Sequence, residues 1–233
     1  MITVLGTRKG GAGKSTIAVN IAARRKMMKN DVCLVDCDDQ LSTTRWNERR
    51  SESKIKPDIP IVNALGRRVG ETLKEQSDRY QDLVVDVPGR DSDELGLAMV
   101  VCDVFAIPLK ISLFDLWALE KDIEKIGTLQ MQRSAIGLPF RPIIFFNEVS
   151  TLPSVRDKQL DQMSEELLKF KSQIQEYGIE ICPAFLSDRD AYKKILHEGK
   201  SVFELGTENP SDLKAQEEII GLYEYIYGGD HGQ

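Results

Sequence analysis

The sequence is poor in the residues that build metal centres. Its 233 residues include only two histidines, His197 and His231, which lie far apart in the chain. The four cysteines are Cys33, Cys37, Cys102 and Cys182. None of them belongs to a C-x-x-C pair, so the sequence argues against a zinc site. Most of them lie in or beside apolar runs, and we expect buried thiols in a reducing compartment.

The chain also lacks a long apolar run and an excess of positive charge. No stretch approaches the ~20 apolar residues that a membrane-spanning helix requires, and no signal sequence precedes the apolar run that begins at Ile2. We therefore expect a cytoplasmic protein. The formal net charge is −6, so the overall field would not attract nucleic acid. Any DNA binding requires a local basic patch.

Strand-like apolar segments alternate with helical segments along the chain. The predicted strands cover 2–7, 31–36, 59–63, 82–87, 102–107, 141–146 and 179–184. The predicted helices cover 15–29, 42–53, 66–78, 92–100, 113–132, 154–176, 189–198 and 211–227. Continuous apolar runs such as 143–146 are typical of parallel strands buried on both faces. The pattern predicts an α/β fold with a doubly wound, mainly parallel sheet flanked by helices, which binds ligands at the carboxyl ends of its strands.

The most informative segment is 7–16, Thr-Arg-Lys-Gly-Gly-Ala-Gly-Lys-Ser-Thr. An apolar run precedes it and a predicted helix follows, which is the setting of a phosphate-binding loop. Backbone N–H groups of such a loop cradle phosphates, Lys14 reaches the outer phosphates and Ser15 binds Mg²⁺. The loop departs from G-x-x-x-x-G-K-[ST] only at Arg8, which replaces the first glycine. Because the chain starts at this loop and shows no linker, we expect a single domain over 1–233 without an N-terminal helix-turn-helix domain.

Two later strands are each predicted to end in an aspartate. Asp36 lies in the run Leu-Val-Asp-Cys-Asp-Asp-Gln at 34–40, and Asp86 lies in Leu-Val-Val-Asp-Val-Pro-Gly at 83–89. An apolar run that ends in aspartate is the Walker B arrangement, in which the carboxylate holds Mg²⁺ directly or through water. Either motif alone is a weak signal. Behind a lysine-containing glycine loop, the two together predict a nucleotide site.

The three motifs resemble those of the deviant Walker ATPases of the ParA/MinD family, and the resemblance spans essentially the whole chain. It implies a P-loop NTPase fold with a deviant Walker A motif. It also implies that the protein binds ATP and Mg²⁺ and hydrolyses ATP slowly, with stimulation by a partner. The implied phosphate-binding residues are Gly10, Gly11, Ala12, Gly13, Lys14, Ser15 and Thr16. The implied Mg²⁺ site comprises Ser15, Asp36 and Asp86.

The resemblance assigns roles to three further side chains. Lys9 matches the signature lysine of the family, which is expected to cross a dimer interface onto the partner's nucleotide, so that ATP drives homodimerisation. Asp38 is expected to position the attacking water, and Asn147 to read adenine. One position departs from the family. Asp39 stands where the family usually has proline, and this added carboxylate would alter the rigidity or charge of the loop.

The C-terminal part of the chain indicates what the ATP-bound dimer would bind. Residues 189–192 and 198–204 resemble the short plasmid-partition ATPases of the ParF-like group. MinD-like members instead bind membranes through a basic amphipathic C-terminal helix. Residues 207–233 hold one basic residue, Lys214, against six acidic ones, Glu208, Asp212, Glu217, Glu218, Glu224 and Asp230. An anionic membrane would repel this segment, so we expect no membrane binding.

ParA-like members bind DNA without sequence preference as ATP dimers. The candidate patch for such binding consists of Arg189, Lys193, Lys194 and Lys200. Clustered cations of this kind suffice for phosphate contacts, but acidic residues lie among them and a solvated helix face explains them equally well. A second cluster consists of Arg45, Arg49 and Arg50. Trp46 lies within it, either stacking on bases or packed in the core.

The sequence favours an ATP-dependent DNA partition ATPase, associated with the nucleoid when ATP is bound. Its expected partner is a centromere-binding adaptor of the ParB/ParG-like kind that stimulates hydrolysis. The alternative is a ParA-like ATPase that positions another cargo or acts in conjugative DNA transfer. A MinD-like membrane ATPase fits less well because of the acidic C-terminal segment. An ATP-dependent ligase or a reductase iron protein also fits less well, because no substrate pocket is evident and Cys102 does not resemble a cluster ligand.

Overall fold

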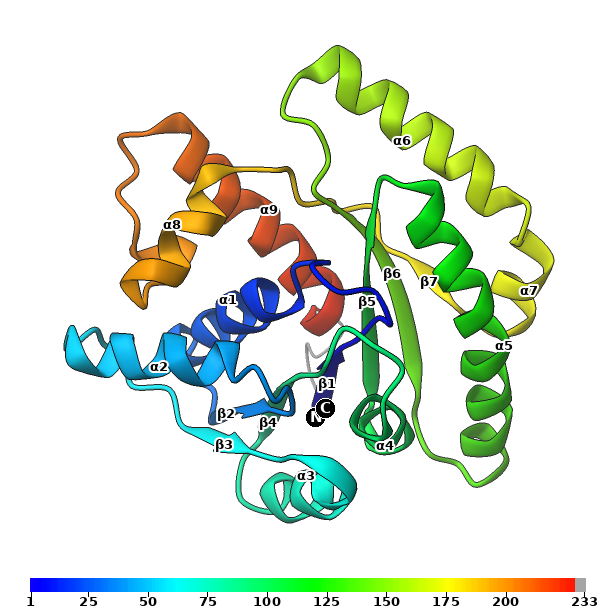
Figure 1. Ribbon diagram of the computed structural model, residues 1–233, viewed down its shortest axis with the longest axis horizontal. Coiled ribbons are helices and arrows are strands. Elements are labelled where there is room, and N and C mark those ends of the chain that lie inside the picture. The colour runs from blue at the N-terminus through cyan, green and yellow to red at the C-terminus, as the bar shows by residue number, and fades with distance from the viewer. Residues whose placement is uncertain (229–233) are drawn as a thin grey trace.

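A computed structural model describes residues 1–228 of the protein. Its centre is a sheet of seven strands in the order β3-β2-β4-β1-β5-β6-β7, and every pairing among them is parallel (Figure 1). The strands are β1 (Ile2–Leu5), β2 (Val32–Asp36), β3 (Ile61–Asn63), β4 (Asp82–Asp86), β5 (Val104–Lys110), β6 (Arg141–Asn147) and β7 (Glu180–Ile181). The predicted fold class is confirmed.

Helices cover both faces of this sheet. The α-helices are α1 (Lys14–Met27), α2 (Ser42–Glu52), α3 (Val69–Ser77), α4 (Asp93–Val101), α5 (Leu113–Ala135), α6 (Pro153–Leu168), α7 (Lys171–Glu176), α8 (Asp190–Glu198) and α9 (Pro210–Tyr227). Short 3₁₀ turns occur at η1 (Gly66–Arg68) and η2 (Val202–Glu204). Apolar side chains of α3 to α7 pack on one face, and those of α1, α2, α8 and α9 pack on the other. The sheet is therefore the middle of three layers.

The central strands are buried on both faces, as their continuous apolar runs predict. Every residue of β1, β2 and β4 is buried. In the parallel register Asp86 lies beside both Leu5 and Asp36. The ends of these three strands therefore bring the phosphate loop and the two predicted Mg²⁺ aspartates to one edge of the sheet.

Two elements differ most from the sequence-based expectation. The strand predicted at 179–184 is reduced to β7: Cys182 still donates to the Ile144 carbonyl oxygen at 2.8 Å, but the next bond to β6, at the Phe146 carbonyl oxygen, comes from Leu186 at 2.9 Å. The helix predicted over 154–176 divides into α6 and α7. The break contains Phe170, whose ring packs on the core between the two helices. Both differences lie at the edge of the sheet, away from the phosphate loop.

The four cysteines are all free and buried, as predicted. Within residues 1–228, no helix combines the length and the apolar character needed to cross a bilayer. Asp230 and His231, which the sequence analysis considered, lie outside the described residues.

Candidate nucleotide site

The phosphate loop connects β1 to α1 and turns sharply at its end. Gly13 adopts a left-handed conformation with φ 82°, and α1 begins at the next residue. The amide of Asn147 donates to the Ala12 carbonyl oxygen at 2.8 Å. A Cβ atom at position 13 would lie 2.5 Å from this amide nitrogen, so glycine is required for space as well as for conformation. The loop therefore presents the N-terminus of α1, a favourable place for phosphate.

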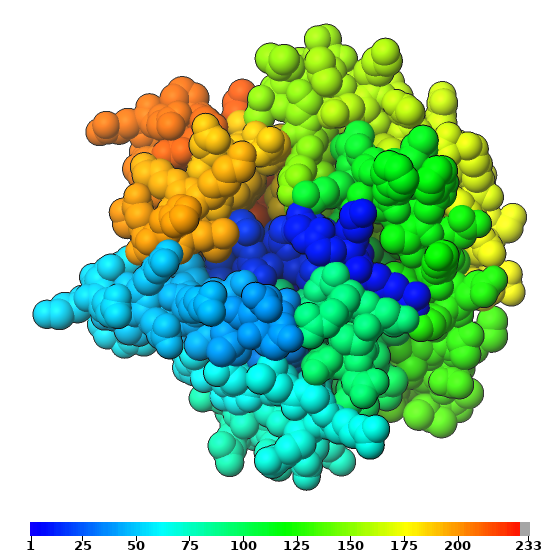
Figure 2. All heavy atoms as spheres, viewed as in Figure 1, coloured from blue at the N-terminus to red at the C-terminus, as the bar shows by residue number. Residues whose placement is uncertain are grey.

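A cavity of about 710 Å³ opens over this loop. Its floor is the loop itself, and its walls include Asp38, Arg90 and Glu148. Residues of α2 and α8 line the far side: Ser42, Arg45, Trp46, Arg49, Leu196 and His197. Figure 2 shows the loop, in dark blue, across the middle of this face, between α2 and α8 on one side and the first turns of α5 on the other. A cavity of this size accommodates a nucleotide.

Two lysines of the loop differ in their surroundings. Lys14 is only 6% exposed, and its ammonium group donates to the Lys9 carbonyl oxygen at 3.4 Å. Burial lowers the pKa of Lys14, while the nearby carboxylates of Asp86 and Asp38 oppose this shift. The side chain of Lys9 is exposed, and no ion-pair partner for it occurs among residues 1–228. Lys14 therefore lines the cavity, whereas the side chain of Lys9, next to the first cavity-lining residue Gly10, is exposed.

Asp86 is fully buried, and within residues 1–228 neither of its carboxylate oxygens has a hydrogen-bond partner of acceptable geometry. Burial raises its pKa to about 7, and the nearby Asp36 adds to the shift, although the Ser15 hydroxyl and Lys14 partly counter it. A buried carboxylate without partners is unfavourable unless a ligand completes it. Asp86 and Ser15 supply the hard oxygen ligands that Mg²⁺ prefers.

Phosphate oxygens would have to complete the coordination of such an ion. Among the residues that the structure describes, no group of three or more His, Cys, Asp or Glu side chains could hold a metal alone. Mg²⁺ is commonly held by one or two carboxylates together with substrate phosphates. The residues present therefore fit Mg²⁺ bound with a nucleotide.

The carboxylate of Asp36, in contrast, is already hydrogen-bonded. One oxygen accepts from the backbone N–H and the hydroxyl of Thr44, both at 2.9 Å, and the other accepts from the Asp38 N–H at 3.2 Å. These bonds attach the end of β2 to the first turn of α2 and shape the loop that carries Asp38. The predicted direct contribution of Asp36 to Mg²⁺ stays a prediction. The sequence analysis missed Thr44, because nothing in the motif marks the residue eight positions further on.

A third loop, after β4, presses against the phosphate loop. A Cβ atom at Gly89 would lie 2.7 Å from the Gly10 Cα atom and 2.8 Å from the Lys14 ammonium nitrogen. Arg90, the next residue, forms a bidentate ion pair with Asp39, at 2.9 and 3.3 Å. The sequence analysis missed Arg90, although its place directly after Pro-Gly in the Asp86 motif is a usable signal.

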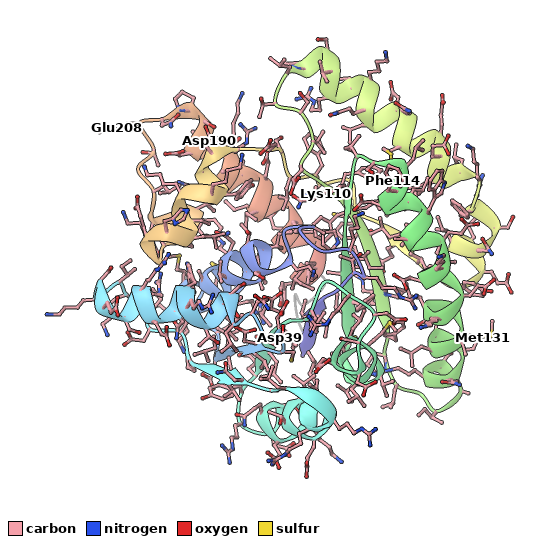
Figure 3. All side chains as sticks on the ribbon, viewed as in Figure 1. Asp39, Lys110, Phe114, Met131, Asp190 and Glu208 are labelled. Carbon is pink, nitrogen blue, oxygen red and sulfur yellow. The ribbon has the colours of Figure 1, made fainter. Side chains whose placement is uncertain are left out.

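A second cation that the sequence analysis missed lies at the end of β5. Lys110, labelled in Figure 3, forms an ion pair with Glu148 at 2.7 Å. Its ammonium nitrogen lies 4.0 Å from the position of a Cβ atom at Gly11. The edge of the sheet therefore carries positive charge on both sides of the phosphate loop.

The residues predicted to bind DNA lie on and around α8, and most of them have acidic partners. The side chain of Arg189 is only 10% exposed and pairs with Glu218 at 2.8 Å, so its contact with DNA stays a prediction. Lys193 pairs with Asp188 at 3.1 Å, and Lys200 pairs with Glu198 at 2.7 Å. Lys194 is exposed, and no ion pair of its side chain occurs within residues 1–228.

The second predicted cluster, Arg45, Arg49 and Arg50, also contains both a buried, paired cation and exposed ones. Arg50 is buried and pairs with Glu204, and the indole N–H of Trp46 donates to the Lys200 carbonyl oxygen at 2.8 Å. Trp46 is therefore a packed residue and does not stack on bases. Arg45 and Arg49 remain exposed. They lie beside α8, since an Arg49 guanidinium nitrogen donates to the Leu196 carbonyl oxygen at 3.3 Å (Figure 1).

Comparison with protein families decides what kind of site this is. Residues 2–202 match the profile of the CobQ/CobB/MinD/ParA nucleotide binding domain, so the match includes all three site loops. The chain belongs to this family. The family-level prediction from the sequence is confirmed, and this ParA/MinD-family ATPase takes ATP together with Mg²⁺.

The chain is similar to ParA/MinD-family proteins that are named for different roles. It is 26% identical over 213 residues to the "Maintenance of carboxysome distribution protein A" of Halothiobacillus neapolitanus, and the alignment covers 91% of each chain. It is 25% identical to "Protein ParA" of Rhizobium radiobacter over 199 residues, covering 85% of this chain and 83% of that one. Its fold is similar to that of a Cyanothece McdA–ATP complex, with a TM-score of 0.70, 13% identity, and coverage of 97% and 96%.

Proposed function

We propose that the protein is an ATP-dependent dimerising switch that binds DNA without sequence preference and acts in DNA partition. The observation that carries the proposal is the contrast between Lys14, which is buried and lines the phosphate cavity, and Lys9, which is exposed on the same loop. A second subunit can reach Lys9, whereas Lys14 is committed to its own loop. ATP bound in the cavity supplies anionic groups that a partner's Lys9 would contact.

The chain's own residues account for slow hydrolysis. Backbone N–H groups of residues 10–16 and the start of α1 would hold the phosphates, and Lys14 would contact the outer ones. Bound Mg²⁺, held by Asp86 and Ser15, would neutralise charge on the phosphates. Asp38 lines the cavity, and its backbone is fixed by Asp36. Its carboxylate would accept a hydrogen bond from the attacking water and orient it.

The ATP-dependent dimer can be tested with Lys9→Ala. We expect this variant to bind ATP but to remain a monomer in a light-scattering measurement with a non-hydrolysable ATP analogue. Lys26→Ala is a matched control, since Lys26 is a lysine in the last turn of α1, at the end of the helix away from the phosphate loop, and pairs with Asp31 at the surface. A Lys9→Ala protein that dimerises as well as the wild type would contradict the shared-site proposal.

The DNA surface that we propose differs from the sequence-based patch. It consists of the exposed cations Arg45 and Arg49 of α2, which also border the far side of the cavity, and Lys194 of the neighbouring helix α8. Arg189 is left out because Glu218 neutralises it. Dimerisation would double this surface, and this doubling would couple DNA affinity to ATP. Such phosphate contacts weaken steeply with salt.

Retention on random-sequence DNA tests this surface. We expect retention with ATP and not with ADP, and loss of retention when the salt concentration is raised. Lys194→Ala should weaken binding and reduce the salt slope by about one for each contact removed. Lys74→Ala, an exposed lysine of α3 on another side of the molecule, should leave DNA binding unchanged. An absence of ATP-dependent DNA retention in the wild type would sink the DNA part of the proposal.

A second candidate function is the positioning of a protein cargo. The relative titled for carboxysome distribution supports it, and the site chemistry is the same in both cases. Deletion of the gene separates the two. Partition predicts faster loss of the DNA that carries the gene, and a centromere-binding adaptor encoded nearby that stimulates ATP hydrolysis. Cargo positioning predicts normal DNA inheritance with clustered cargo.

A further inference from the structure

The ion pair between Asp39 and Arg90 joins two loops that border the phosphate cavity. Asp39 lies on the loop after β2, next to Asp38, and Arg90 lies on the loop after β4. The pair is bidentate, and both side chains are about half exposed, at 54% and 52%. The guanidinium also holds the pKa of Asp39 below its ordinary value.

Arg90 is held close to the place where phosphates would bind. Gly89 is in such close contact with the phosphate loop that a Cβ atom there would meet Gly10 and Lys14 within 2.8 Å. Arg90, the next residue, lines the same cavity as Lys14. The long side chain of Arg90 therefore starts from a backbone position that is already fixed beside the loop.

Nothing else in the described structure holds the Arg90 guanidinium. Within residues 1–228, the guanidinium donates hydrogen bonds to the two carboxylate oxygens of Asp39 and to no other side chain. Exposed ion pairs contribute little to stability, with typical values of about 0–1 kcal/mol. A terminal phosphate carries more negative charge than a carboxylate, and the arginine fork matches phosphate as well as it matches carboxylate. The pair is weak enough for a phosphate to replace Asp39.

We propose that Arg90 exchanges its contact with Asp39 for the terminal phosphate of ATP, and that Asp39 occupies Arg90 when that phosphate is absent. Arg90 then distinguishes a nucleoside triphosphate from a diphosphate, and Asp39 competes with the γ-phosphate. The release of Asp39 also frees the loop that carries Asp38. This inference rests on the ATP-binding part of the proposed function.

The exchange predicts effects of opposite sign for the two partners. Arg90→Ala removes a contact that forms only with the triphosphate, so the ratio of ATP-analogue affinity to ADP affinity should fall roughly tenfold, the value typical of a charged hydrogen bond. Asp39→Asn removes the competitor with little change in shape, so the same ratio should rise several-fold. The double variant should behave like Arg90→Ala. A pair that only stabilises the loops would give both single variants the same sign.

The measurement is a titration with fluorescent ADP and a fluorescent non-hydrolysable ATP analogue in the presence of Mg²⁺. All variants are made in a Lys9→Ala background, so that contacts from a second subunit do not contribute. Arg68→Ala is the matched control, since Arg68 also forms an exposed ion pair, with Glu71, but lies on η1 away from the cavity. Arg90→Lys should recover part of the ratio because it keeps the charge and loses the fork.

The outcomes separate this inference from the proposal on which it rests. If the Lys9→Ala protein binds neither nucleotide, the proposed function fails. If it binds both, but Arg90→Ala and Asp39→Asn shift the affinity ratio in the same direction or leave it unchanged, only the exchange is overturned. Urea unfolding of each variant shows whether it is folded under the conditions of the titration.

Discussion

The carboxyl edge of the sheet and the contact between α8 and α9 treat their charged groups in opposite ways. At the edge, Asp86 is fully buried, and its carboxylate has no hydrogen-bond partner of acceptable geometry in the described part of the chain. Between α8 and α9, Glu218 accepts hydrogen bonds from the backbone and hydroxyl of Ser187, from Arg189 and from Tyr192, at 2.7 to 3.0 Å. A buried charged group without hydrogen-bond partners lowers the free energy of unfolding and indicates a ligand site. We call a buried charged group whose hydrogen bonds are formed within the protein a completed group, and it only stabilises the fold. Charge alone does not separate the two kinds of region.

The largest expected effect concerns the edge. Lys14→Ala should lower the affinity for ATP by more than about a hundredfold, because it removes the buried ammonium group that faces the phosphates. Isothermal titration with ATP and Mg²⁺ measures the change. The control is again Lys26→Ala, on the same helix, which should bind ATP normally. If Lys14→Ala bound ATP as tightly as the wild type, Lys14 would not contact the phosphates, and the contrast between the two regions would lose its ligand site.

The second prediction tests the completed region. Glu218→Ala should lower the free energy of unfolding by about 3 kcal/mol, because it leaves the Arg189 guanidinium buried without its partner. Urea denaturation gives the change, and Glu217→Ala, at the exposed neighbouring position, should alter stability by less than about 0.5 kcal/mol. The ATP affinity of Glu218→Ala should be normal below its unfolding midpoint. If Glu218→Ala were as stable as the wild type, the ion pair between Arg189 and Glu218 would not contribute to the free energy of unfolding.

The third prediction compares two aspartates at the same edge. Without Mg²⁺, Asp86→Asn should raise the free energy of unfolding by about 2 kcal/mol, since it removes a buried charge that has no hydrogen bond. It should also abolish the effect of Mg²⁺ on ATP affinity. Asp36→Asn should instead destabilise the protein by about 1–2 kcal/mol, because its carboxylate has three hydrogen bonds to lose. Urea denaturation of both variants with and without Mg²⁺ measures these changes, and destabilisation by Asp86→Asn would contradict the contrast.

The sequence was sufficient for the fold class and for the three motifs at the edge, and insufficient for contacts between distant segments, for a physical reason. The phosphate loop and the ends of β2 and β4 are local signals: an apolar run, a glycine turn and an aspartate follow one another within a few residues. Parallel register then brings them together. The partner of Arg189 is Glu218, 29 residues away on α9. Such a pairing depends on how α8 packs on α9, which no local pattern records.

The same limit explains the missed residues. Arg90 and Asp39 lie on different loops, 51 positions apart, and only the packing of Gly89 on the phosphate loop brings them together. The division of the helix predicted at 154–176 has a similar cause, since Phe170 leaves the helix to pack on the core. Long-range packing, and not local propensity, decides each of these cases.

The smallest expected effect concerns Asp122, which has an ion-pair partner, as Glu218 does, and is unfavourable to bury in its charged form, as Asp86 is. Asp122 of α5 pairs with Arg8 of the phosphate loop at 2.5 Å, yet burial raises its pKa from 3.8 to about 6. The folded protein therefore binds this proton more tightly than the unfolded chain does. The stability that Asp122 contributes is fully present below pH 3.8 and is lost as the pH rises through about 6.

Comparison with Asp122→Asn isolates this contribution, because the variant does not titrate at that position. Between pH 5 and pH 7, the free energy of unfolding of the wild type should fall relative to that of Asp122→Asn by about 1 kcal/mol. Urea denaturation of both proteins at the two pH values gives the difference. If the wild type instead gains stability relative to the variant over this range, attraction to Arg8 outweighs desolvation, and Asp122 belongs with Glu218 among the completed groups. A relative loss places it with Asp86, as a group whose burial costs more than its single partner returns.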